Sequence, residues 1–160
     1  MKIPRARSGA AASLVIFGIA LGVRALVTLW AAARIPPVED GHFYHVVATR
    51  IAQGLGYTWL WPDGAVTYAA HYPVGYPALI AAAYALFAAA PASAMGCNAL
   101  LGSLAAVAAG RMVSSYVRGG AGTVAGLLVA LHPALVAYTP ALMTEGATAS
   151  LLMIAGWLAV

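Results

Sequence analysis

The chain has 160 residues, of which 63% are hydrophobic and only 8% are charged. Soluble domains carry about 25% charged residues and disordered chains are far more polar, so the composition predicts an integral membrane protein. The net charge is +4, but the basic residues are scattered singly among apolar runs, which excludes a soluble nucleic-acid-binding protein. The single cysteine, Cys97, excludes a disulfide framework and a cysteine-rich metal site.

The first predicted element is a transmembrane helix over residues 10–33. This apolar run is interrupted only by Arg24, and three basic residues precede it, Lys2, Arg5 and Arg7. A secretory signal peptide is the alternative, with Ala31–Ala33 resembling a cleavage site, but its apolar core is normally about 7–15 residues long. We therefore expect an uncleaved helix, with a cytoplasmic N-terminus because of the basic flank.

Residues 34–91 form a predicted outer loop with juxtamembrane helices. This segment holds three of the four acidic residues and three of the four histidines. Pro36 and Pro37 end the first helix, and Asp40 to Gly54 then has the apolar spacing of a short helix with one apolar face. Such a helix lies along a membrane surface, and the Pro62-Asp63-Gly64 turn follows it.

The apolar run at 75–90 has two readings. Its 16 residues reach only about 24 Å, short of the hydrocarbon core of ~30 Å, so it either lies on the outer surface or crosses with local thinning of the bilayer. The surface reading places Arg111 and Arg118 in the cytoplasm, as the positive-inside rule favours, and puts Glu145 on the same side as Asp40. The crossing reading places Glu145 in the cytoplasm.

Three further membrane segments are expected at 92–117, 121–141 and 146–160, the last being the start of a span. It stops within apolar sequence, with no flanking charge. We therefore expect an all-α polytopic transmembrane bundle of which this chain is the N-terminal segment.

Four short motifs occur in order along the chain: D-G-x-x-Y at 40–44, H-Y-P-V-G-Y-P at 71–77, N-x-L-L-G at 98–102 and T-E at 144–145. Together they resemble the N-terminal part of the GT-C glycosyltransferases that use lipid-linked sugars, with protein mannosyltransferases and aminoarabinose transferases as the nearest groups. The resemblance covers residues 34–152. The chain departs from the family pattern in having Gly41 after the aspartate and Val74 before the glycine of the second motif.

The resemblance implies a bacterial inner-membrane enzyme among membrane lipids. It implies transfer of a sugar from a polyprenyl-phosphate donor to a glycan, lipid or protein acceptor on the non-cytoplasmic face. Asp40 is then the catalytic base, because an acceptor hydroxyl is a poor nucleophile without a carboxylate to take its proton. The phosphate leaving group needs cationic or hydrogen-bonding partners, for which Arg50 and His71 are the candidates.

The other expected site residues are Glu145, as a second acidic catalytic residue, and three substrate-binding residues, Glu39, Tyr44 and Tyr72. Each has a simpler interpretation. Asp40 has the residue type of a helix N-cap, and Glu145 that of a cap for the last helix. Tyr44 and Tyr72 also fit an aromatic belt at the membrane interface, and Glu39 a solvated side chain.

Two alternatives to this picture remain open. Asp40, His42 and His45 could hold a divalent metal ion, since i,i+3 histidines share a helix face, although no tight ligand motif is present. The chain could also be a non-catalytic scaffold or assembly subunit, or a truncated inactive relative. A transporter fragment is a weaker third reading, because it needs charged side chains along a path through the membrane, and only Arg24 and His132 qualify.

Overall fold

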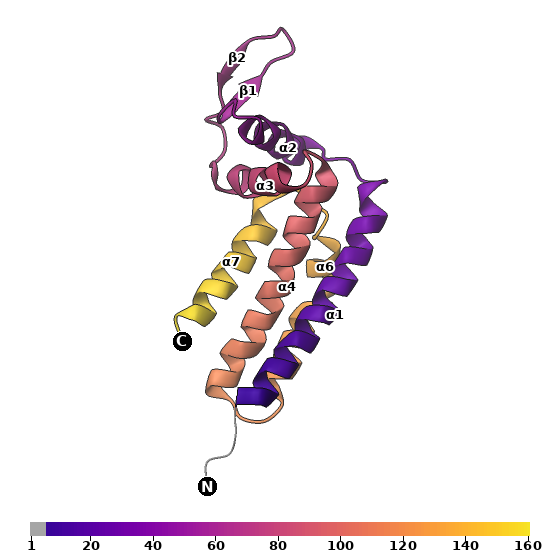
Figure 1. Ribbon diagram of the computed structural model, residues 1–160, viewed down its shortest axis with the longest axis vertical. Coiled ribbons are helices and arrows are strands. Elements are labelled where there is room, and N and C mark those ends of the chain that lie inside the picture. The colour runs from indigo at the N-terminus through magenta and orange to yellow at the C-terminus, as the bar shows by residue number, and fades with distance from the viewer. Residues whose placement is uncertain (1–5) are drawn as a thin grey trace.

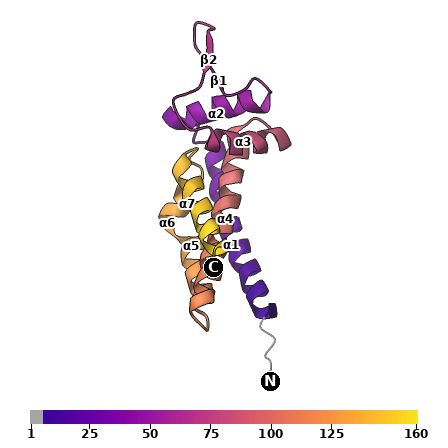
Figure 2. The same ribbon diagram turned by 90° about the vertical axis from the view of Figure 1, so that its left-hand side faces the viewer.

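The computed structural model describes residues 6–160, with side chains from Gly9 onward, and within them seven helices and one two-stranded hairpin. A long bundle runs along the molecule, and two helices lie across one of its ends (Figures 1 and 2). The hairpin projects beyond these crosswise helices. Lys2 and Arg5, and the side chain of Arg7, lie outside the described part, so the predicted basic flank does too. The bundle helices are α1 (Ala6–Ala32), α4 (Pro91–Tyr116), α5 (Ala121–Leu131), α6 (Pro133–Ala137) and α7 (Thr144–Leu158).

Two helices are long and apolar enough to cross a membrane, Gly9–Ala32 within α1 and the whole of α4. At 1.5 Å per residue they reach about 36 and 39 Å, more than the ~30 Å hydrocarbon core. Large apolar side chains of α1 point away from the bundle: Leu14 and Leu29 are each 72% exposed. A long helix with an unpartnered apolar surface is typical of a segment in contact with lipid.

The predicted span at 121–141 is not one helix. α5 ends at Leu131, His132 is extended with ψ of 118°, and the short α6 begins at Pro133. A proline has no N–H to donate and forces the preceding residue out of the helical region. The expectation of a continuous helix is therefore wrong, and the reason is Pro133.

Arg24 donates hydrogen bonds to the carbonyl groups that this break leaves without partners at the end of α5. Its side chain is only 2% exposed, and it donates hydrogen bonds to the carbonyl oxygens of Ala130 at 2.8 Å and Val129 at 3.2 Å. The last carbonyls of a helix lack intrahelical partners, and the dipole favours a cation beside them. Arg24 thus links α1 to the C-terminus of α5 inside the bundle.

Small residues allow α4 and α5 to pack with their backbones close together. A β-carbon on Gly122 would lie 2.5 Å from the carbonyl oxygen of Gly110, and one on Gly126 would lie 3.1 Å from the carbonyl oxygen of Ala106. Both glycines of α5 are buried. Contacts of this kind are a common way for helices to associate where both are surrounded by lipid.

The helices α2 (Glu39–Ala52) and α3 (Gly75–Leu86) lie across the end of the bundle in both views (Figures 1 and 2). α3 has 12 residues, about 18 Å. It runs crosswise to α4, which is the arrangement that the surface reading of 75–90 requires. The buried face of α2, with Tyr44 and Ala48, joins a core cluster with Ile80 and Tyr84 of α3.

The fold is mostly helical, but the expectation of an all-α chain missed a hairpin in the outer loop. Strands β1 (Thr58–Leu60) and β2 (Val66–Tyr68) pair antiparallel, with Trp59 opposite Thr67. The turn between them contains Gly64 at φ of +87°, and Asp63 Oδ1 accepts a hydrogen bond from the Ala65 N–H. Strands of three residues are too short to show an alternating pattern in the sequence.

Candidate functional site

Asp40 lies in the first turn of α2, half-buried at the junction of the crosswise helices with the bundle. The hydroxyl of Tyr72 donates a hydrogen bond to Asp40 Oδ1 at 2.7 Å, although 32 residues separate the two in the chain. The preceding residue, Glu39, has φ of 47°, a left-handed conformation that costs a residue other than glycine about 1–2 kcal/mol. Local strain of this kind is concentrated at functional sites.

Tyr44 lies one helical turn beyond Asp40 and is 3% exposed. Burial raises the pKa of Tyr44, the side chain of Thr144 opposes that rise, and the carboxylates of Asp40 and Glu145 add to it. The rings of Tyr44 and Tyr72 also lie against one another, with centres 5.3 Å apart. The structure thus brings together Asp40, Tyr44 and Tyr72, three of the residues expected to form the site.

The start of α7 is held against α2 by a close backbone contact. Gly41 is buried under Leu142, such that a β-carbon on it would lie 3.4 Å from the Leu142 carbonyl oxygen. Glu145, in the first turn of α7, is exposed and accepts a hydrogen bond of 3.3 Å from the Thr144 hydroxyl. The start of α2 therefore packs directly against the segment that leads into α7.

Asn98 of α4 supports this junction from below. Its amide nitrogen donates to the carbonyl oxygens of Thr139 at 3.2 Å and Ala141 at 2.9 Å. Because both amide hydrogens are then used, the hydroxyl of Tyr76 donates to the amide oxygen at 3.2 Å. The asparagine of the N-x-L-L-G motif therefore ties α3 to the segment that leads into α7, a role that the sequence alone did not indicate.

An open pocket of about 620 Å³ lies beside Asp40. Aromatic rings form much of its wall: Phe43 stacks on Trp59 with ring centres 5.2 Å apart, and His71 meets Tyr72 edge-on at 4.4 Å. Glu39 and Asp40 bring carboxylates to the same wall. Flat aromatic faces next to carboxylates suit a ring with apolar C–H faces and hydroxyl groups around its edge.

Arg50 does not reach this pocket. It lies ten residues beyond Asp40 on α2, about 15 Å along the helix axis, and its Nε donates to Thr58 Oγ1 at 2.7 Å. The guanidinium thus joins the C-terminal end of α2 to the hairpin. Arg50 therefore lies away from the pocket, whereas His71 is part of its wall.

The three weak metal candidates do not converge. His45 Nδ1 lies 2.7 Å from the hydroxyl of Tyr84, and burial lowers the pKa of His45. His42 is exposed and meets Trp59 edge-on. Among residues 6–160, no three His, Cys, Asp or Glu side chains cluster as metal ligands, so the metal site considered for Asp40, His42 and His45 is not formed.

Tyr57 was not among the expected site residues, yet it orients the loop that carries Tyr72. Its hydroxyl donates a hydrogen bond to the backbone carbonyl of Tyr72. Burial raises the pKa of Tyr57, so the phenol stays protonated and continues to donate at neutral pH. The only sign of this role in the sequence was the placement of Tyr57 directly after Gly54 and Gly56.

The hydrogen bond between Tyr72 and Asp40 predicts an unusual tyrosine titration. Donation to the carboxylate raises the pKa of Tyr72 above its ordinary value of 10.0, because ionised phenol would lose the bond and face a like charge. We expect Asp40→Asn to lower this pKa towards 10.0. The measurement is the ultraviolet absorbance of tyrosinate against pH, with Tyr72→Phe identifying the contribution of Tyr72. An unchanged titration in Asp40→Asn would show that the bond is absent in solution.

No protein-family model, curated protein or solved structure matches this chain.

Proposed function

We propose that this chain carries the acceptor-activating site of a membrane glycosyltransferase that takes its sugar from a polyprenyl-phosphate donor. The observation that supports this most is the hydrogen bond from Tyr72 to the Asp40 carboxylate, at the wall of a pocket lined by aromatic rings. The motif resemblance and the two helices able to cross a membrane agree with it. Like the resemblance, the proposal places the site on the non-cytoplasmic face of a bacterial inner membrane.

In the proposed reaction the carboxylate of Asp40 takes the proton of the acceptor hydroxyl. The acceptor oxygen forms a bond to the anomeric carbon of the sugar as the bond from that carbon to the phosphate oxygen breaks. Polyprenyl phosphate leaves with the bonding electron pair. The Tyr72 hydroxyl orients the Asp40 carboxylate through the bond of 2.7 Å.

The leaving phosphate requires positive or hydrogen-bonding partners. Arg50 is occupied with Thr58, and Arg34 donates to the Trp30 carbonyl at 2.9 Å while lying over the Trp30 ring. The imidazoles of His42 and His71, which line the pocket, are therefore the better candidates. A lipid carrier also fits a site at the end of a bundle, where a polar head and an apolar tail meet different surroundings.

Sugar transfer itself tests the proposal. Spheroplasts that produce the protein would be supplied with polyprenyl-phosphate-mannose labelled in the sugar, and we expect the label to pass to envelope glycan, lipid or protein. Asp40→Asn should abolish that transfer. Transfer that is the same with and without the protein would favour a scaffold role instead.

The sidedness of the site can be measured by labelling single cysteines in a Cys97→Ser background. His42→Cys and Glu145→Cys introduce thiols at exposed positions in the first turns of α2 and α7, and Ser115→Cys places one at the opposite end of the bundle, at the end of α4. We expect an impermeant maleimide outside the cell to label the first two and not the third. Labelling of position 145 only from the cytoplasm would mean that 75–90 crosses the membrane and that Glu145 is not part of the site.

A further inference from the structure

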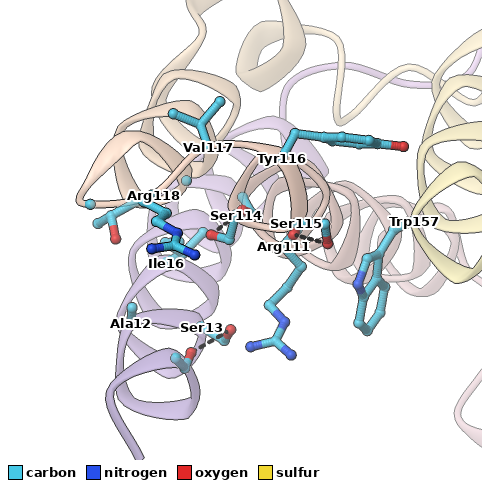
Figure 3. Close-up of a pocket in the computed structure, with 15 residues that line it drawn as sticks. Ala12, Ser13, Ile16, Arg111, Ser114, Ser115, Tyr116, Val117, Arg118 and Trp157 are labelled. Atoms are coloured by element: carbon cyan, nitrogen blue, oxygen red, sulfur yellow. Dashed lines mark hydrogen bonds between the residues drawn. The ribbon is translucent and has the colours of Figure 1, made fainter. Parts of the chain in front are cut away.

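A second and larger pocket, of about 860 Å³, lies at the other end of the bundle from Asp40. It is formed by the first turns of α1, the end of α4, the start of α5 and Trp157 of α7 (Figure 3). The glycosyl transfer proposed above makes no use of it. Its chemistry therefore needs an explanation of its own.

Two guanidinium groups, those of Arg111 and Arg118, line this pocket and are exposed. Figure 3 shows Arg111 reaching from α4 into the space between α1 and Trp157, and neither arginine donates a hydrogen bond to another residue drawn there. The four acidic residues of the chain lie at the opposite end, on α2, on the hairpin turn and at the start of α7. The positive charge of this pocket is thus not neutralised by any described carboxylate.

The remaining polar groups of the wall also favour an anion. The first turn of α5 has no side chain capping its free N–H groups, and such N–H groups attract negative charge. The hydroxyls of Ser114 and Ser115 donate to backbone carbonyls of their own helix, at 2.8 and 3.2 Å. Donors for a ligand therefore come from the two arginines and from the start of α5.

The position of the pocket along the apolar stretch of α1 indicates which kind of anion it binds. Gly9 and Ser13 in its wall belong to the first turns of the apolar stretch of α1, so the pocket lies where that stretch leaves the hydrocarbon. Trp157 and Tyr116, residue types enriched at membrane interfaces, flank it, and Ile16 adds apolar surface. A ligand here would have an anionic head and apolar chains in the adjoining lipid.

We propose that this pocket binds the phosphodiester headgroup of an anionic phospholipid in the leaflet opposite the Asp40 site. Arg111 and Arg118 would contact the phosphate oxygens, with the N–H groups of α5 behind them. Guanidinium groups suit this task because their N–H pairs match the spacing of phosphate oxygens. This binding is independent of glycosyl transfer.

The test is a titration of the purified, delipidated chain with short-chain phosphatidylglycerol and, separately, phosphatidylcholine. We expect saturable binding of phosphatidylglycerol only, weakened about thirtyfold in Arg111→Gln/Arg118→Gln, because each basic residue near an anionic lipid contributes about fivefold. Arg111→Lys/Arg118→Lys, which keeps the charge and loses the paired N–H groups, should bind more tightly than the glutamine variant and less tightly than the unaltered chain. Arg34→Gln removes an exposed arginine from the other end of the molecule and should change nothing.

Two outcomes would overturn the proposal. The first is equal binding of both lipids, or unchanged affinity for phosphatidylglycerol in the double glutamine variant. The second is full competition by inorganic phosphate at the same concentration as the lipid, which would identify a site for free phosphate. Circular dichroism of the variants would confirm that the helices remain folded in each case.

Discussion

Replacing Asp40 by asparagine is expected to lower the rate of sugar transfer by about 10²- to 10⁴-fold, the usual contribution of a general base. Asparagine has the same shape, and its amide oxygen can still accept the hydrogen bond that Tyr72 donates to Asp40 at 2.7 Å. The fold around α2 should therefore persist while the proton acceptor is lost. The measurement is the initial rate of label transfer from polyprenyl-phosphate-mannose, together with the amount of protein inserted in the membrane.

A matched control for this substitution is Asp63→Asn. Asp63 is exposed on the hairpin turn, where its side chain accepts a hydrogen bond from the Ala65 N–H, and it lies outside the pocket beside Asp40. The change in charge is identical, so a general effect of charge would lower both rates. Transfer retained by Asp40→Asn would remove Asp40 as the base, and an equal loss in Asp63→Asn would mean that the effect is not specific to the site.

The largest effect on stability is expected from Gly122→Ala. A β-carbon at this position would lie 2.5 Å from the Gly110 carbonyl oxygen and would also meet the side chain of Ser114. The serine can rotate, but the backbone of α4 cannot move without separating the two helices. Overpacking of this kind costs about 1–3 kcal/mol, which outweighs the gain of ~1 kcal/mol in helix propensity from glycine to alanine.

Gly22→Ala on α1 provides the comparison. A β-carbon there would have no heavy atom within 4 Å. The substitution therefore brings the same gain in helix propensity without a steric clash. Thermal unfolding of both variants in the same detergent micelles should show a lower midpoint for Gly122→Ala and an unchanged or higher one for Gly22→Ala. Equal midpoints would mean that α4 and α5 are not in backbone contact at Gly110.

Most of the helices were predictable because they coincide with apolar runs, or, in the case of α2, with the spacing of one apolar face. The run at 92–117 became α4, Pro91–Tyr116, and the predicted surface helix at 40–54 became α2, Glu39–Ala52. The hairpin at 58–68 was missed because three-residue strands have no period to detect. The break at His132 was not expected, because the segment is apolar on both sides of Pro133. The proline nevertheless keeps His132 out of the helical conformation.

For the candidate site, the motif resemblance pointed to Asp40, Tyr44, Tyr72 and Glu145, and polar groups stand out in so apolar a chain. The composition alone predicted a membrane protein built of helices, because a backbone in lipid must satisfy its own hydrogen bonds. Which groups meet was decided by the tertiary structure. Tyr72 reaches Asp40 over 32 residues and Arg24 reaches Ala130 over 106, and Arg50 turns to Thr58. Contacts at such separations depend on how helices cross and pack, and no local pattern in a single sequence encodes that geometry.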